Sequence, residues 1–311
     1  MSTVRRCYNA AMSLRLAVVL LFAGTFAIAF SPTFVRLSEI GPVATAVYRV
    51  ALALPVLFLL VAMGGKDGRA RPETRGDWLG VILAGLFFAG DLAFWHWSIA
   101  NTSVANASLF ATSTPIFVTL AAWLLLGERI SRRFLIGLAL GIAGGLLLAG
   151  SSVQTNPAHL FGDLMGLVTA MFFSAYLITI KRLRERLSAA AVMAWPGAIT
   201  ALALGLLNLA VDGAWTPLTA YGWGLLLALA LLSHALGQGL VAKAVHRLPA
   251  SFSAVGMLSE PLFAALIAWA VLGEAVTSLQ GLGGVIILAG IAISRPLPDR
   301  ALARPLAQGL G

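Results

Sequence analysis

Residues 115–133 read PIFVTLAAWLLLGERISRR, and residues 261–279 read PLFAALIAWAVLGEAVTSL. Both stretches open on a proline, carry one tryptophan and reach a Leu-Gly-Glu motif, at a constant spacing of 146 residues. The first copy continues into Arg129, Arg132 and Arg133, whereas the second continues without a charged residue. A repeat whose flanking charges differ in this way is expected when one copy lies upside down in a membrane.

The composition also points to a membrane. Hydrophobic residues make up 59% of the 311 residues and charged residues only 11%, more apolar surface than a soluble domain can hide. Apolar stretches of about 18 to 24 residues recur along the chain, each long enough to cross ~30 Å of hydrocarbon. The ten stretches are, approximately, 16–35, 43–63, 78–99, 104–126, 133–150, 163–180, 189–211, 220–242, 252–272 and 278–294. We therefore predict an all-α polytopic membrane protein with ten transmembrane helices.

The positive charges predict the orientation of these helices. With the N-terminus in the cytoplasm, every lysine and arginine except Arg36 and Arg49 falls in a segment on the cytoplasmic side. This bias follows the positive-inside rule, so we expect an integral protein of the inner (plasma) membrane with both termini cytoplasmic. A face that binds nucleic acid would need these charges on one soluble surface, and they are dispersed between apolar spans instead.

Ten spans divide into two halves of five, and because five is odd the second half starts on the opposite side of the membrane. The predicted organisation is a cytoplasmic N-terminal segment (1–15), a first five-helix repeat (16–150), a second, inverted repeat (163–295) and a cytoplasmic tail (296–311). No small-residue cleavage site ends the first apolar run, so we expect it to be retained as a helix.

Residues 103–131 (SVANASLFATSTPIFVTLAAWLLLGERIS) and their second copy over residues 249–274 resemble the EamA-type family of the drug/metabolite transporter superfamily. The ten-helix count and the tandem units fit this resemblance. It implies a basket of helices around a central cavity, with the fifth helix of each half at the periphery. It also implies export of small metabolites. One branch of the family consists of amino acid exporters, including exporters of aromatic amino acids.

Several chemistries lack their sequence signals. The chain has no Gly-rich phosphate loop, no metal-binding cluster and no nucleophile elbow, so we expect neither an enzyme nor a cofactor or metal. The leading hypothesis is a secondary transporter that exports small metabolites, amino acids first among them, by alternating access. The alternatives are a passive solute channel and an intramembrane enzyme or lipid flippase.

The first candidate site residue is Glu260, which lies inside the ninth predicted span directly before Pro261. Proline removes a backbone donor and loosens the preceding turn, which frees carbonyl groups for a substrate. The matched part of the fourth span carries Thr112, Ser113, Thr114 and Pro115. Two proline-broken helices at equivalent places point to a binding site. The alternative is a simple kink with Glu260 in a structural ion pair.

The third predicted span carries Asp91 and, four residues later on the same face, Trp95, followed by His96. A carboxylate beneath an aromatic ring suits an amine, although a tryptophan here also suits an interfacial aromatic belt. Arg49, inside the second span, is the one deep cation. It is placed to hold a carboxylate, or to pair with Asp91 or Glu260 and hold the bundle together.

His234 and Gln238 share a face of the eighth predicted span, where a histidine can carry a coupling proton or serve a structural role. Tyr176 and Trp195 are candidates for the cavity wall, with core packing as the alternative. Together these residues form an amphoteric, partly aromatic set that suits a zwitterionic or aromatic metabolite.

Glycines at positions 137, 141 and 145 form a stripe of small residues in the fifth predicted span. Such a stripe allows close helix packing, here against the fourth span or a second subunit. We expect a monomer, with a homodimer as the alternative, and the lipid bilayer and a small-molecule substrate as the partners.

Overall fold

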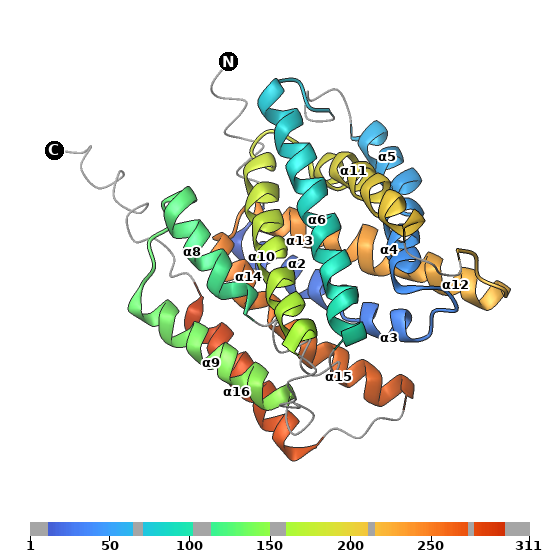
Figure 1. Ribbon diagram of the computed structural model, residues 1–311. Helices are drawn as coiled ribbons and strands as arrows, with labels where there is room; N and C mark the ends of the chain where they lie inside the picture. The colour runs from blue at the N-terminus through green and yellow to red at the C-terminus, as the bar shows by residue number, and fades with distance from the viewer. Residues whose placement is uncertain are drawn as a thin grey trace.

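The computed structural model describes residues 12–64, 71–101, 113–149, 160–210, 215–272 and 277–295, which form helices and their connections without a strand (Figure 1). The helices are α2 (Leu14–Ile28), α3 (Ser31–Arg36), α4 (Pro42–Ala51), α5 (Leu54–Met63), α6 (Arg75–Asn101), α8 (Thr114–Leu126), α9 (Arg132–Ala149), α10 (Leu160–Leu183), α11 (Ala189–Leu209), α12 (Ala220–Ala228), η3 (Leu229–Gln238), α13 (Gly239–Val245), α14 (Ala250–Met257), α15 (Ser259–Leu272) and α16 (Ser278–Ser294).

Within these described ranges, seven segments are long and apolar enough to cross a membrane. They are Leu14–Arg36, Pro42–Met63, Arg75–Trp95, Leu160–Leu183, Ala189–Leu209, Ala220–Val245 and Ala250–Val271. Two shorter apolar helices, α8 and α16, join them. Each of the ten predicted stretches overlaps at least one of the described helices. The count of ten complete spans stays a prediction.

Several spans are interrupted part-way. The first span breaks between α2 and α3 just before Pro32, and the second breaks between α4 and α5 just before Pro55. In each case proline occupies the second position of the new helix, where its missing N–H would have had no partner in the helix. In the ninth predicted span, α14 ends at Met257 and α15 begins at Ser259, so Glu260 and Pro261 lie in the first turn of α15.

Basic residues from separate connections meet at one end of the bundle, which we call the basic end. Arg247 Nε donates to the backbone oxygen of Met12 at 3.2 Å. Arg186 lies 3.3 Å from Asp77, at the start of α6. At the opposite end of the bundle the contact involves an acidic residue. Glu39, before α4, accepts hydrogen bonds from the hydroxyl and the N–H of Thr219, the N-cap of α12.

The first Leu-Gly-Glu motif closes one helix and caps another at the basic end. Gly127 ends α8 with φ 66°, a left-handed conformation that glycine adopts without strain. The carboxylate of Glu128 then accepts from the N–H groups of Ala250 (2.6 Å) and Ser251 (3.2 Å), at the start of α14. Lys181 Nζ lies 3.9 Å from the same carboxylate. An anion at a helix N-terminus is favourable, so Glu128 fastens the first half of the chain to the second.

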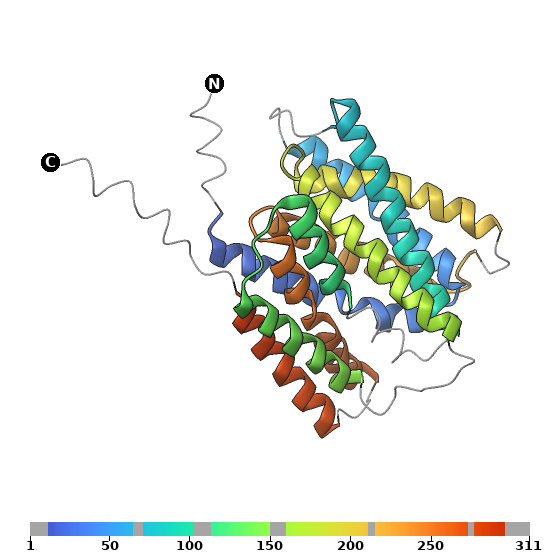
Figure 2. The ribbon, with the colours of Figure 1, turned by 60° about the vertical axis from the view of Figure 1, so that its left-hand side comes forward.

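Helices α9 and α16 lie side by side at the edge of the bundle (Figures 1 and 2). A Cβ atom added to Gly137 would lie 2.5 Å from the backbone oxygen of Gly290, and one added to Gly144 would lie 2.7 Å from that of Gly283. The partner of the predicted glycine stripe is therefore α16 rather than α8, and Gly144, which the prediction did not include, also meets α16 backbone to backbone. Glycine is needed because only hydrogen atoms separate the two backbones.

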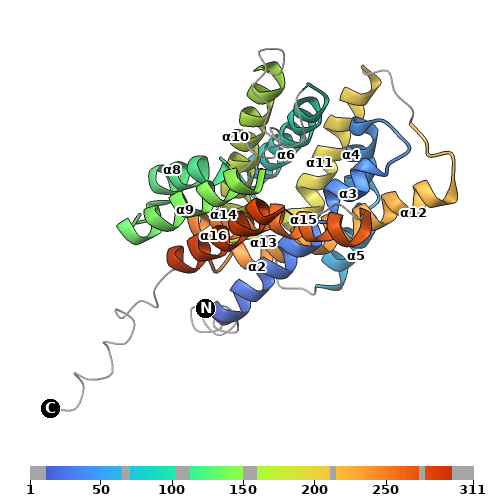
Figure 3. The same ribbon diagram turned by 90° about the horizontal axis from the view of Figure 1, so that it is seen from below.

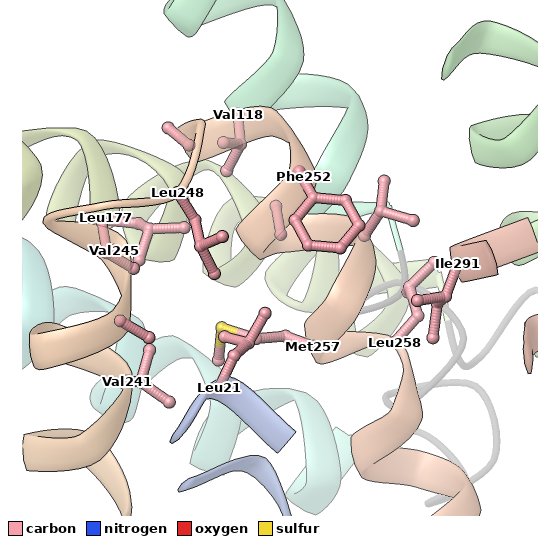
Figure 4. Packing of buried hydrophobic residues seen from close by; sticks show 14 of the residues in the cluster. Leu21, Val118, Leu177, Val241, Val245, Leu248, Phe252, Met257, Leu258 and Ile291 are labelled. Atoms are coloured by element: carbon pink, nitrogen blue, oxygen red, sulfur yellow. The ribbon is translucent and has the colours of Figure 1, made fainter. Parts of the chain in front are cut away.

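The apolar interior is built across both halves of the chain. One buried cluster joins α2, α8, α10, α13, α14 and α16, with Phe252 among its largest fully buried side chains (Figure 4). The outer surface is apolar as well. Trp123 and Trp269, the matched tryptophans of the two copies, are 56% and 57% exposed, so they face outward, where lipid covers a membrane bundle.

Candidate functional site

The site is built around Arg49, which α4 carries into the interior with 6% of its surface exposed. Its Nη1 atom donates to the hydroxyl of Ser31 at 2.9 Å. Ser31 is the first residue of α3, directly after the break in the first span. The break therefore supplies a polar partner for a charge that would be costly to bury alone.

Four predicted candidates lie within electrostatic range of Arg49. They are Asp91 on α6, Tyr176 on α10, His234 on η3 and Glu260 on α15. Figure 3 shows the bundle in which these helices and α4 lie, seen from below. Asp91 and His234 are buried, and Glu260 is half-buried. We call Ser31, Arg49, Asp91, His234 and Glu260 the central polar cluster.

An aromatic stack holds one side of this cluster. The ring of Phe88 stacks on Tyr176, with centroids 4.6 Å apart, and on His234, with centroids 5.6 Å apart. The Tyr176 hydroxyl donates to the sulfur of Met193 at 3.7 Å. The stack fixes the plane of the His234 ring without using either of its nitrogens.

The eighth predicted span changes its winding where it carries His234. Residues Leu229–Gln238 form a π-helix between α12 and α13. Such helices are rare in proteins, and those that occur are often found at functional sites. Ser233 in the same segment donates to the backbone oxygen of Ala27, at the end of α2, at 3.1 Å. Gln238 ends the segment and is buried.

Three nitrogens of the cluster are buried and have no hydrogen-bond partner among the residues that the structure describes: Nε of Arg49 and both ring nitrogens, Nδ1 and Nε2, of His234. Folded proteins leave few buried polar atoms unpaired, and such atoms often mark a ligand or an ordered water. Among the described residues, no group of His, Cys, Asp and Glu is arranged to hold a metal ion.

The other predicted residues lie outside this cluster or outside the part of the chain that the structure describes. Thr114 and Pro115 are buried at the start of α8, where the Thr114 carbonyl accepts from Ser174 of α10 at 3.4 Å. Ser113 is the N-cap of α8, and Thr112 lies outside the described residues. Trp195 packs against Phe58 and Trp78, with centroids 5.2 and 5.5 Å away.

Trp95 is half-buried one turn beyond Asp91 on α6. His96 follows it on the same helix, and its side chain is outside the description. Sequence reasoning missed Ser31, Phe88 and the π-helix. Pro32 signals the break that places Ser31, but an apolar phenylalanine and a change of helical winding have no comparable sequence signal.

One guanidinium, two carboxyl groups and an imidazole inside a bundle of membrane-length helices define a class of protein. Ionisable groups at such depth are costly and mark the paths of ions or substrates, so the class is that of membrane transport proteins. The sequence matches the EamA-like transporter family over residues 15–150 and 160–295. The chain belongs to this family and is a transmembrane transporter.

Similar proteins include named exporters. The pseudopaline exporter of Pseudomonas aeruginosa is 28% identical over 80% of this chain and 84% of its own length. A probable terminal-alkyne amino-acid exporter of Streptantibioticus cattleyicolor is 28% identical over 86% of this chain and 89% of its own. A solved chain described only as a crystal structure of a protein superposes with a TM-score of 0.78. It covers 94% of this chain and 98% of its own at 18% identity, and supports the fold alone.

Proposed function

We propose that this protein is a secondary transporter that exports small metabolites, amino acids first among them, across the inner membrane by alternating access. It would use ten membrane helices in two inverted halves, with both termini in the cytoplasm. The observation that carries the proposal is the convergence of Arg49, Asp91 and Glu260, from three different helices, in the interior of the bundle.

The contacts at the basic end support the proposed orientation of the protein in the membrane. Lysine and arginine side chains gather at the basic end, where Arg182 Nη2 donates to the Leu125 carbonyl at 2.7 Å and Arg133 Nε donates to that of Ile293 at 2.9 Å. The positive-inside rule makes this end cytoplasmic.

The chemistry of the cluster supports an amino acid as the cargo. A guanidinium binds a carboxylate, and a carboxylate binds an ammonium group. The names of the two exporters described above agree with an export function, and one of them names terminal-alkyne amino acids as its cargo.

The test is counterflow in proteoliposomes without ATP. A carrier gives saturable exchange of the transported solute, and Glu260→Gln and Asp91→Asn each reduce it at least about tenfold, the effect of losing ~1.4 kcal/mol of binding. Glu39→Gln, which changes a carboxylate at the opposite end of the bundle, serves as the control and keeps wild-type exchange. Size-exclusion profiles verify that the variants remain folded.

Two outcomes would contradict the proposal. Non-saturating flux of many unrelated solutes would indicate a passive channel. Full activity in both Glu260→Gln and Asp91→Asn would show that transport does not use the central polar cluster.

A further inference from the structure

His234 occupies a special position with respect to the repeat. It lies 146 residues after Phe88, the same spacing that relates the two Leu-Gly-Glu copies, and the two rings stack on each other. Two residues that exchange places under a two-fold rotation touch only where the axis passes between them. Phe88 and His234 therefore straddle the pseudo-two-fold axis that relates the halves of the chain.

The glycine contacts of α9 and α16 support the same axis. Gly137 meets Gly290 and Gly144 meets Gly283, while the repeat spacing relates Gly137 to Gly283 and Gly144 to Gly290. This reciprocal, antiparallel pairing is what a two-fold axis between the helices produces. Substrate sites of transporters with inverted repeats lie at the interface of the repeats, which is where His234 lies.

The unpaired atoms at this place specify the chemistry of an occupant. Arg49 Nε is a donor and needs an acceptor. An imidazole has one N–H donor and, when uncharged, one acceptor nitrogen. His234 is 1% exposed, and neither of its nitrogens has a hydrogen-bond partner in the described part of the chain. The carboxyl groups of Asp91 and Glu260 nearby are acceptors for a donor of opposite charge.

We infer that His234 and Arg49 select substrates by their head group, a carboxylate and an ammonium group attached to the same carbon atom. The carboxylate accepts from Arg49 Nε, the ammonium group donates to Asp91 and Glu260, and the His234 imidazole hydrogen-bonds to the same head group. Phe88 holds the imidazole plane, so His234 is a specificity-determining residue. The inference rests on the proposed function and names the part of the substrate that the site recognises.

The experiment uses the full chain in proteoliposomes loaded with three matched sets of solutes. These are the proteinogenic amino acids, the amines left by their decarboxylation and the acids left by their deamination, with efflux followed by mass spectrometry. Through the wild-type protein, the transported amino acids leave at least about tenfold faster than either counterpart, because each counterpart leaves buried charged groups unpaired.

Variants assign this selectivity to His234. His234→Leu lowers the ratio of amino acid to amine efflux, because only Arg49 then recognises the carboxylate, whereas His234→Gln, which can still donate and accept, keeps more of it. Asn208→Leu is the matched control, because the buried side-chain nitrogen of Asn208 on α11 also finds no hydrogen-bond partner among the described residues, and it leaves the ratio unchanged.

Other results would overturn the inference. An amine or acid counterpart that leaves as fast as its amino acid would do so, as would an unchanged ratio in folded His234→Leu and His234→Gln. Efflux of solutes without the head group, while no amino acid moves, would refute the inference, but the protein would still be a transporter. Absence of any specific efflux would instead refute the proposed function.

Discussion

The α9–α16 pair and the central polar cluster relate to the sequence repeat in opposite ways. In the pair, equivalent glycines of the two copies make equivalent contacts, Gly137 with Gly290 and Gly144 with Gly283. In the cluster, no member has a copy of itself 146 residues away. The counterparts are Leu177 for Ser31, Trp195 for Arg49, Gly237 for Asp91, Phe88 for His234 and Thr114 for Glu260.

The difference teaches which parts of a duplicated chain can stay symmetric. Backbone contacts between glycines suit both copies equally, so they can hold a scaffold together. A second arginine at the position of Trp195, which packs against Phe58 and Trp78, would instead place another charge inside a membrane-length helix, where a charge is costly. The chemistry of the site therefore requires the two halves to differ.

The largest effect is expected from removing the cation at the centre. Arg49→Ala removes the positive neighbour of buried Asp91 and half-buried Glu260, and removing one partner from a buried arrangement of charges costs about 3–5 kcal/mol. We expect a strongly reduced yield of folded protein and loss of exchange, with partial recovery in Arg49→Lys. Unfolding in detergent measures the first effect, and wild-type stability with full exchange in Arg49→Ala would contradict the assignment.

The next effect tests the symmetric pair. In Gly137→Leu the new side chain must displace the backbone of α16, which we expect to cost about 1–3 kcal/mol of the free energy of unfolding. Gly281→Ala on α16 is the control, because its added Cβ atom meets no atom of the described residues within 4 Å. Exchange per folded molecule stays at the wild-type level in both variants. A transport defect without a stability defect in Gly137→Leu would show that the α9–α16 pair takes part in transport itself.

A smaller effect tests whether the matched glutamates of the two Leu-Gly-Glu motifs have the same structural role. Glu128→Gln weakens the cap on α14 because it removes the negative charge that accepts from Ala250 and Ser251. The expected loss is about 1 kcal/mol, seen as a lower unfolding temperature. Glu274→Gln changes the matched residue of the second copy, and a similar loss is expected if both copies serve the scaffold. A loss in one variant only would limit the symmetry to α9 and α16.

The smallest effect concerns the opposite end and depends on pH. Hydrogen bonds from the Thr219 hydroxyl and from the N–H groups of Thr219 and Leu218 hold the pKa of Glu39 below its ordinary value. A carboxyl group with a lowered pKa stabilises the folded state above its unfolded pKa of about 4.5. This contribution is lost as pH falls through the folded pKa. The unfolding temperatures of wild type and Glu39→Gln should thus differ at pH 7 and converge as the pH falls below the lowered pKa of Glu39, whereas a difference that stays constant with pH would contradict the contact.

Much of the fold follows from local patterns. The apolar stretches predict where helices lie, and the costly charges inside them, Arg49, Asp91 and Glu260, are the residues that the structure brings within electrostatic range of one another. The matched prolines were less informative about the cluster, because Thr114 packs against Ser174 of α10 instead. Which helix faces converge depends on packing between distant segments, and hydropathy carries no information about it.

By itself, the sequence determined that this chain is a duplicated, all-helical membrane protein with few interior charges, because hydrophobic length and the cost of burying charge are local properties. Only the tertiary structure decided that α16 receives the glycines of α9, that Ser31 receives Arg49, and that Phe88 and His234 meet at the axis between the halves. Each of these contacts joins residues that are far apart in the chain or on separately broken helices. They form only when both partners are already folded and packed.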